Sequence, residues 1–294
     1  RFPAAIKNGH GAQAEDYEGK KYIDFGSGIG TNSLGFCNSK WVQAVVSQVS
    51  QLQHTSNLFY TLPDSLLAER LCEVTGYSKV FFGNSGAEAN EGAIKVARKY
   101  GMEVKGEHCN RIITLENSFH GRTVTTLSAT GQDIFHQHFF HFTEGFLYVP
   151  ANNSYVLHET VDDTVCAVML ELVQGESGVN VLKKEYVKEV EQICKEKGIL
   201  LIADEVQTGV GRTGTFLCCE QYGIHPNVVT LAKGLGAGLP IGAVLMDKLT
   251  ESILQTGDHG STFGGNPVVC AGALEVVNQI VDADFLADVN SKAE

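Results

Sequence analysis

The sequence predicts an α/β fold in which a mainly parallel sheet is covered by helices. Short apolar runs recur along the chain, and they alternate with segments whose apolar residues follow helical spacing. The runs are continuous rather than alternating, which is typical of strands buried on both faces of a parallel sheet. Ligands of such folds bind outside the carboxyl ends of the strands, so polar residues at those ends are the candidates for function.

The expected elements can be placed in order along the chain. A hairpin within residues 14–25 turns near Glu18 and Gly19 and belongs to a small, separate layer. Strands of the main sheet are expected at residues 80–82, 111–115, 165–170, 199–203 and 228–232. Between strands, apolar residues at helical spacing mark two helices: Ala89, Ala93, Val96 and Ala97 in one, and Tyr186, Val187, Val190, Ile193 and Cys194 in the other. A last helix begins near Pro267, because proline suits the first helical turn.

Three parts are expected from this order of elements. Residues 1–35 form an N-terminal segment of a small domain, residues 36–265 form the large domain, and residues 266–294 form a linking helix. That helix is expected to lead towards a C-terminal small domain absent from this chain. The sequence contains no internal repeat, low-complexity tract or linker.

Composition limits the class of protein. The chain has 294 residues, of which 43% are hydrophobic, enough for one large core or two moderate ones. A formal net charge of -12 disfavours a nucleic-acid partner, and no apolar stretch approaches membrane-spanning length. Eight scattered cysteines without a CxxC pair predict reduced thiols, and therefore a cytoplasmic protein.

Lys233 is the first candidate for chemistry. It closes the apolar run of residues 228–232 and opens a glycine-rich stretch that continues to Pro240. A lysine at the end of a buried strand is well placed to form an imine with a bound carbonyl cofactor. The resulting hypothesis is an enzyme that uses pyridoxal 5'-phosphate.

A helix start after the strand at residues 80–82 offers an anion site. Ser85 and Glu88 have the spacing of a capping box, in which the serine caps the helix and the glutamate reaches back to the cap's own N–H. Gly86 and Ala87 then leave free N–H groups at the positive end of the helix dipole, suited to a phosphate. An ordinary capped helix is the structural alternative.

Phe119 and Arg122 follow the strand at residues 111–115. The ring can stack on a flat cofactor, and the guanidinium can bind a carboxylate in bidentate fashion. A core phenylalanine and a surface ion pair are the structural alternatives. His120, between them, is assigned no catalytic role.

Asp204 ends a buried strand, where a carboxylate needs a positive partner. A protonated pyridine nitrogen is such a partner, and keeping it charged makes the cofactor an electron sink. A magnesium site shared with Glu205 is the alternative, but adjacent strand residues point to opposite faces. No metal is therefore expected.

The ordered motifs together resemble the class III aminotransferases over essentially the whole chain. They are Asn84-Ser85-Gly86-Ala87-Glu88-Ala89, Phe119-His120-Gly121-Arg122-Thr123, Gln174-Gly175-Glu176, Asp204-Glu205-Val206-Gln207-Thr208-Gly209, Ala232-Lys233-Gly234, and Gly260-Ser261-Thr262-Phe263-Gly264-Gly265-Asn266-Pro267. Six motifs in the right order are far more specific than any one of them. The resemblance implies the large domain of a fold-type-I pyridoxal-phosphate transferase.

The resemblance implies a role for each matched residue. Lys233 carries the cofactor covalently and later moves a proton between the substrate carbon and the cofactor's C4′. Asp204 pairs with the pyridine nitrogen, and Gln207 contacts the phenolic oxygen. Phosphate binding falls to the backbone N–H groups of Gly86 and Ala87, while Phe119 stacks on the ring.

The remaining implied roles concern substrates and a second subunit. Arg122 binds a substrate carboxylate, with Ser261 nearby, and Thr262 reaches the phosphate of a neighbouring subunit, which implies a homodimer with shared active sites. Glu176 is implied to pair with an arginine of a C-terminal domain and to help the site alternate between the ω-amine and 2-oxoglutarate.

Within the family the motifs are most similar to the acetylornithine type. That similarity implies transfer of the terminal amino group of N2-acetylornithine to 2-oxoglutarate, giving N-acetylglutamate semialdehyde and glutamate in arginine biosynthesis. Other ω-amino donors (ornithine, succinylornithine, 4-aminobutyrate), an aminomutase, and a cofactor-binding protein without turnover stay open.

Two segments depart from the family pattern, and one suggests another class. A Gly-His-x-His-Pro-like turn is usual where this chain has Gly35-Phe36-Cys37-Asn38-Ser39, and a proline commonly stands in place of Leu172. Neither change touches a catalytic group. Gly26-Ser27-Gly28-Ile29-Gly30 allows a nucleotide-binding module, although no clear amphipathic helix follows it.

Overall fold

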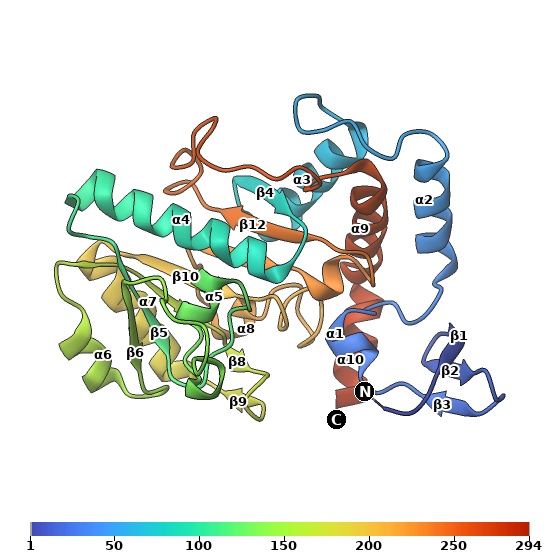
Figure 1. The fold of residues 1–294 in the computed structure, drawn as a ribbon, viewed down its shortest axis with the longest axis horizontal. Coiled ribbons are helices and arrows are strands. Elements are labelled where there is room, and N and C mark those ends of the chain that lie inside the picture. Colours follow the sequence, from blue (N-terminus) through green and yellow to red (C-terminus); the bar gives the residue numbers. More distant parts are fainter. Residues whose placement is uncertain (1, 294) are drawn as a thin grey trace.

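A seven-stranded sheet forms the centre of the computed structural model, which describes residues 2–293 (Figure 1). Its strands follow the order β4-β12-β11-β10-β7-β5-β6. Their bounds are β4 Lys79–Gly83, β5 Arg111–Leu115, β6 Phe146–Val149, β7 Val165–Leu170, β10 Leu200–Asp204, β11 Val228–Leu231 and β12 Gly242–Met246. All are parallel except β12, which is antiparallel to both neighbours. The α/β class and the mainly parallel sheet are confirmed.

All five predicted strands of this sheet lie within one residue of the observed bounds. Sequence reasoning missed β6 and β12. The first is a short edge strand with partly exposed residues, so its pattern is weak, whereas β12 is buried along its whole length. A short apolar run of that kind does not distinguish a strand from a buried helical segment.

Helices cover both faces of the sheet (Figure 1). On one face α4 (Gly86–Lys105) packs on β7, β11 and β12, and on the other α7 (Lys184–Lys197) packs on β7 and β10 beside α6 (Ser154–Thr160). Beside β4, α9 (Pro267–Ile280) packs against α2 (Ser39–Val49) and α3 (Leu62–Thr75). The remaining short helices are α1 (Ser27–Gly30), α5 (Val124–Ala129), η1 (Asp133–Phe135), α8 (Cys219–Tyr222), η2 (Lys233–Leu235) and α10 (Ala283–Ala293).

Two small sheets lie outside the main one. Antiparallel strands β1 (Ile6–His10), β2 (Gln13–Asp16) and β3 (Lys21–Ile23) form a layer away from the main sheet, and β8 (Val173–Gln174) pairs with β9 (Asn180–Val181). The predicted hairpin is thus confirmed as β2–β3. The third strand, β1, pairs with β2 and was not predicted from the sequence. The domain boundaries at residues 35 and 265 stay a prediction.

The structure shows what surrounds the two departures from the family pattern. Leu172 is fully buried, so a side chain fills the place usually taken by proline. Gly35 has a φ of +74°, and a Cβ there would lie 2.9 Å from the carbonyl oxygen of Gly11. The turn therefore requires glycine even though the residues after it differ. No helix in the described range 2–293 is long and apolar enough to cross a membrane.

Candidate active site

A cavity of about 470 Å³ opens where the parallel strands end. Its lining includes eight of the residues selected from the sequence: Gly86, Ala87, Phe119, Arg122, Glu176, Asp204, Gln207 and Lys233. These residues follow four different strands and the β8 segment, and only the sheet brings them together. Ser261 and Thr262 do not line the cavity.

Lys233 is the first residue of η2 and is separated from the end of β11 by Ala232 alone. Its φ is +36°, a strained value for a residue other than glycine, and the next carbonyl, that of Gly234, accepts a 2.7 Å hydrogen bond from the Ser33 hydroxyl. The side chain is 20% exposed, and its Nζ lies 3.8 Å from Oε1 of Glu176. The turn thus presents a partly desolvated amine to the cavity.

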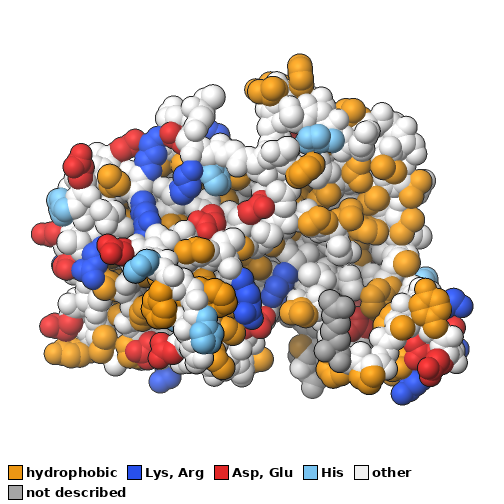
Figure 2. Space-filling view, in the orientation of Figure 1, with side chains coloured by type: hydrophobic (Ala, Val, Ile, Leu, Met, Phe, Trp, Pro, Cys, Tyr) orange, Lys and Arg blue, Asp and Glu red, His pale blue; other side chains and the backbone are white. Residues whose placement is uncertain are grey.

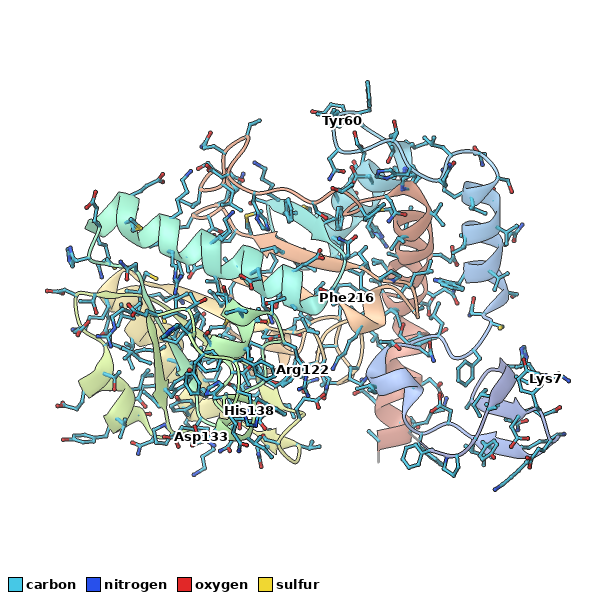
Figure 3. The ribbon with its side chains drawn as sticks, in the orientation of Figure 1. Lys7, Tyr60, Arg122, Asp133, His138 and Phe216 are labelled. Atoms are coloured by element: carbon cyan, nitrogen blue, oxygen red, sulfur yellow. The ribbon has the colours of Figure 1, made fainter. Side chains whose placement is uncertain are left out.

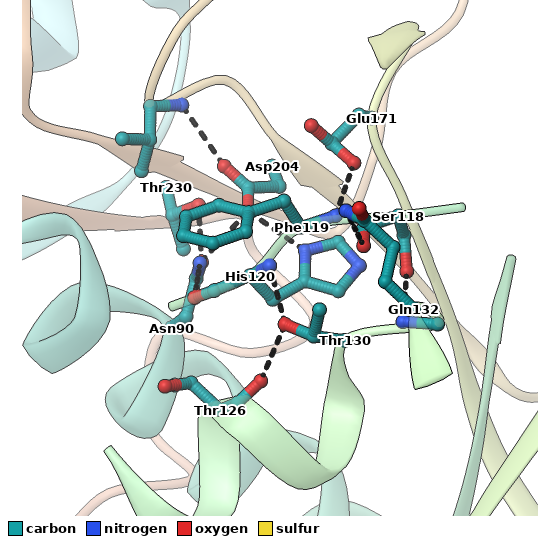
Figure 4. Close-up of polar contacts among 12 residues, drawn as sticks. Asn90, Ser118, Phe119, His120, Thr126, Thr130, Gln132, Glu171, Asp204 and Thr230 are labelled. Carbon is teal, nitrogen blue, oxygen red and sulfur yellow. Dashed lines mark hydrogen bonds and ion pairs between the residues drawn. The ribbon is translucent and has the colours of Figure 1, made fainter. Parts of the chain in front are cut away.

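Asp204 is held by three donors at the end of β10 (Figure 4). Its Oδ2 accepts a 2.7 Å hydrogen bond from Nδ2 of Asn90 and lies 2.8 Å from Nδ1 of His120. Its Oδ1 accepts a 3.0 Å bond from the N–H of Val206. Asn90 is fixed in turn by the Thr230 hydroxyl, which donates to its Oδ1 at 2.7 Å. This buried network fixes the direction of the carboxylate and compensates part of its desolvation.

Sequence reasoning missed the partners of Asp204. It gives His120 no role, whereas the structure places this buried ring against the carboxylate. The sequence could have indicated Asn90 and Thr230, because each is a polar residue in an otherwise apolar pattern. Asn90 lies on the buried side of α4, and Thr230 lies inside the buried strand β11. Polar groups in such places need partners, so they indicate a buried network.

The start of α4 presents free backbone donors to the cavity. Ser85 caps the helix as expected, accepting a 3.2 Å bond from the N–H of Glu88. The prediction that the Glu88 side chain accepts from the N–H of Ser85 is wrong. Glu88 accepts instead from the backbone N–H and from Nδ2 of Asn84, at 2.6 and 2.8 Å. The N–H groups of Gly86 and Ala87 have no partner among the described residues. An anion can therefore bind them.

Gly86 also requires the absence of a side chain. A Cβ at this position would lie 2.7 Å from Cγ1 of Val206, a cavity residue that follows Asp204. The loop after β10 and the start of α4 are thus in direct contact. Both Gly86 and Val206 line the cavity, together with Ala87 and Asp204.

Glu171 is a second buried carboxyl group in the cavity wall. It follows β7, and its Oε2 accepts a 2.8 Å bond from the N–H of Phe119. Burial first, and then the nearby charge of Asp204, raise the pKa of Glu171 well above its ordinary value. The neutral acid is therefore favoured here, and it fixes the backbone that carries Phe119, whose ring is only half-buried.

Glu176 and Gln207 meet at the cavity rim. Nε2 of Gln207 donates a 3.2 Å bond to Oε1 of Glu176, the same oxygen that faces Lys233. A Cβ at residue 175 would lie 1.7 Å from Oε1 of Gln207, so only glycine permits this arrangement. The implied contact of Gln207 with a phenolic oxygen and the implied arginine partner of Glu176 stay predictions.

Ser261 and Thr262 lie beside the site rather than in it. Oγ of Ser261 accepts a 2.9 Å bond from Nδ2 of Asn84, the residue before the helix cap. The Thr262 side chain is exposed. Its implied role across a subunit boundary stays a prediction.

Local contacts argue against the two alternative sites. The N–H groups of Gly26 and Ser27 both donate to Oδ1 of Asp24. These two donors of the glycine-rich segment are therefore already hydrogen-bonded and are not presented to a phosphate. Glu205 accepts from the N–H groups of Cys218 and Cys219, on the side of the strand opposite the partners of Asp204. The two adjacent carboxylates therefore do not converge on one ion.

A covered parallel sheet with a strained lysine, a buried aspartate and free helix amides at its strand ends is the architecture of an α/β enzyme with a strand-end active site. The family model of the class-III aminotransferases matches residues 1–294, and the chain belongs to this family. Acetylornithine aminotransferase of Haemophilus ducreyi is 52% identical over 296 residues, covering 100% of this chain and 75% of that protein.

Solved structures agree with this membership. The ornithine aminotransferase of Toxoplasma gondii superposes with a TM-score of 0.94 at 36% identity, covering 97% of this chain and 69% of that one. N-acetylornithine aminotransferase of Stenotrophomonas maltophilia gives a TM-score of 0.86 at 35% identity, with 100% and 72% covered. The fold and the ordered motifs therefore both identify the chain as an aminotransferase of this family.

Proposed function

We propose that the chain is a pyridoxal 5'-phosphate-dependent transaminase that moves the terminal amino group of N2-acetylornithine to 2-oxoglutarate. The observation that carries the proposal is the convergence, in one cavity, of the Lys233 amine, the buried Asp204 carboxylate and the free amides of Gly86 and Ala87. The name of the Haemophilus relative supports the choice of donor.

The cavity fits the proposed cofactor in size and in chemistry. Its volume of about 470 Å³ is within the usual range for small-molecule sites. An amine, an anion site and a buried carboxylate are the groups needed for an aldehyde, a phosphate and a protonated ring nitrogen. Phe119 and Val206 supply apolar wall between them. Lys233, Asp204, Gly86 and Ala87 would hold the group.

Each residue then has a defined task in the reaction. The bound cofactor would supply an electron sink for the carbon that carries the amino group to be transferred. Lys233, once its amine is free, would take the proton from that carbon on Nζ and hold it for return to the bound cofactor, and its partial exclusion from water suits such a base. The three donors hold the Asp204 carboxyl group in a fixed direction, so no reorganisation is needed during the reaction.

Substrate recognition is assigned to the cavity rim. Arg122 is exposed there and would bind the α-carboxylate of the donor, and Glu176 would help to separate the two substrates. Ornithine is the second candidate donor, because the ornithine aminotransferase of Toxoplasma gondii superposes on this chain with a TM-score of 0.94. Free thiols at all eight cysteines fit a cytoplasmic enzyme, which cell fractionation would check.

A homodimer is part of the proposal. Hydrophobic side chains gather over α2, α3 and α9 in Figure 2, and a groove there includes exposed Leu52, Tyr60, Leu62 and Leu66. Tyr60, 96% exposed, projects from the end of this region in Figure 3. An apolar surface of this kind is typical of a permanent interface. Light scattering should give twice the mass of the chain, and a monomer at micromolar concentration would contradict the dimer.

The experiment that tests the function removes the lysine. Lys233→Ala should abolish the visible absorbance band of the lysine-bound cofactor and reduce transamination by several orders of magnitude, because no other amine replaces it. Lys248→Ala is the matched control, since Lys248 is exposed and its one ion-pair partner among residues 2–293 is Glu251. N2-acetylornithine, ornithine, succinylornithine and 4-aminobutyrate are offered singly. A band that survives in Lys233→Ala contradicts the central assignment, and a preference for ornithine selects the second donor.

A further inference from the structure

Arg122 stands on the cavity rim without a polar partner. Within residues 2–293 its guanidinium makes no hydrogen bond and no ion pair. It lies instead over two aromatic rings, with Cζ 4.5 Å from the centroid of Phe135 and 5.6 Å from that of Phe119. The nearer ring belongs to a residue that no sequence motif selects.

The two rings form a corner around the guanidinium. Their centroids are 5.9 Å apart, and their planes meet at 76°, an edge-to-face arrangement that is itself favourable. Phe119 comes from the loop after β5, and Phe135 comes from η1, which lies between α5 and β6. Figure 3 places Arg122 next to the loop that carries Asp133 and His138.

The segment around Phe135 is anchored to the rest of the site. Nε2 of Gln132 donates a 2.9 Å bond to the carbonyl of Ser118, directly before Phe119, and the N–H of Phe135 donates to the carbonyl of Gln132 at 3.0 Å. On the other side, Nε2 of His136 lies 2.9 Å from the carbonyl of Leu127. The backbone that carries Phe135 is therefore anchored on both sides of this residue.

Stacking of this kind restricts an arginine without using its donors. The guanidinium is attracted to the face of a ring, while its N–H groups lie in its own plane and stay available at the edge. A free arginine on a rim samples many rotamers, and each must be lost when a carboxylate binds. Holding Arg122 against two rings removes part of that cost before binding.

We propose that Phe135 is a positioning residue that determines specificity, because it holds Arg122 stacked with its bidentate edge available to the carboxylate of the amino donor. This inference rests on the proposed function for the role of Arg122. It adds a residue from η1 to the substrate site, and it makes the sequence of the loop between α5 and β6 a determinant of which donors are accepted.

Binding of unreactive carboxylates tests the inference apart from turnover. N-acetyl-L-norvaline has the α-carboxylate and acyl group of the proposed donor but no amine to transfer, and valerate has the carboxylate alone. Calorimetry on the cofactor-loaded protein should show that Phe135→Leu weakens binding of both probes about threefold to tenfold, the size of one cation–π contact. Phe135→Tyr should restore binding to within about twofold, since the ring is kept.

Phe142→Leu is the matched control. Phe142 lies in the same loop and is half-buried, and its ring packs against His136 and Phe140 rather than Arg122. Its loss should leave both Kd values unchanged. In turnover, Phe135→Leu should raise KM for the carboxylate-bearing donor with kcat nearly constant and should leave putrescine, a diamine without a carboxylate, unaffected.

The outcomes separate this inference from the proposed function. Equal binding by wild type and Phe135→Leu, failure of wild type to bind either carboxylate, or equal losses in Phe142→Leu each overturn the role of Phe135. If Phe135→Leu weakens binding of both probes but wild type binds N-acetyl-L-norvaline no better than valerate, the role of Phe135 is supported. The same result contradicts the proposal that the donor is acetylated. Turnover of N2-acetylornithine with normal KM in Phe135→Leu supports the donor and overturns the role.

Discussion

Two adjacent buried carboxyl groups at the end of β10, those of Asp204 and Glu205, are stabilised by different kinds of hydrogen-bond donor. On the cavity side, Asp204 is held mainly by the side chains of Asn90 and His120, which come from other elements of the sheet and its covering helix. On the opposite side, Glu205 is fully buried and accepts from the backbone N–H groups of Cys218 and Cys219, at 2.6 and 2.8 Å. One carboxylate is oriented and the other joins two segments of chain.

This difference favours Asp204 as the carboxylate that serves the proposed reaction and Glu205 as the one that serves the fold. Side-chain donors hold Asp204 in a fixed direction at the cavity wall, as an electrostatic partner requires. Glu205 ties the end of β10 to the start of α8, and so closes the intervening loop that carries Val206 and Gln207 into the cavity. We therefore expect substitutions on the two sides to have opposite signatures in activity and stability.

Asp204→Asn is expected to have the largest effect. Turnover should fall about 10²–10³-fold, the size seen when one preorganised electrostatic partner is removed, while the cofactor stays bound. Asparagine keeps nearly the same shape, but its Nδ2 replaces one acceptor oxygen, so one of the buried donors loses its partner and the free energy of unfolding should fall by about 1 kcal/mol. Steady-state kinetics and absorbance spectra check this, and wild-type turnover would contradict the electron-sink role.

Glu205→Ala should act on stability instead. Two buried N–H groups lose their acceptors and a cavity remains, so the free energy of unfolding should fall by about 3 kcal/mol. Glu220→Ala is the matched control: Glu220 is exposed and accepts one bond from the N–H of Leu217, and its loss should cost below about 1 kcal/mol. Denaturant unfolding measures both. Equal losses in the two variants would mean that the buried clamp has no special role.

The pH dependence of stability should sharpen the comparison further. Burial, only partly offset by the two backbone N–H groups, raises the pKa of Glu205 to about 7. Its contribution to stability is therefore fully present below about pH 4.5, the unfolded value, and is lost as pH rises through about 7. The groups that face it electrostatically are Cys218, Cys219, Tyr77 and Glu220.

Glu205→Gln removes this titration, since glutamine resembles the neutral acid at every pH. The free energy of unfolding of wild type should fall relative to this variant between pH 5 and 8, by up to about 3 kcal/mol. Denaturant unfolding at several pH values checks the difference. Parallel curves for the two proteins would show that Glu205 does not titrate in this range.

Local patterns of residues were enough for the sheet and for most of the cavity. The apolar runs located β5 and β7 to the residue, because a buried strand needs apolar side chains on both faces. Strand order then put Asp204 and Lys233 at the same edge. The helix cap at Ser85 was equally local, since its hydrogen bond spans only three residues.

The sequence by itself determined the α/β class, the strand ends that carry Asp204 and Lys233, and the family. Only the tertiary structure decided that Asn90 and His120 hold the Asp204 carboxylate and that Phe135 stacks on Arg122. The physical reason is distance along the chain: Asn90 lies 114 residues before Asp204, and no periodic pattern links them. Such contacts arise when the sheet and its helices pack, so residues that are unremarkable in their own segments become neighbours.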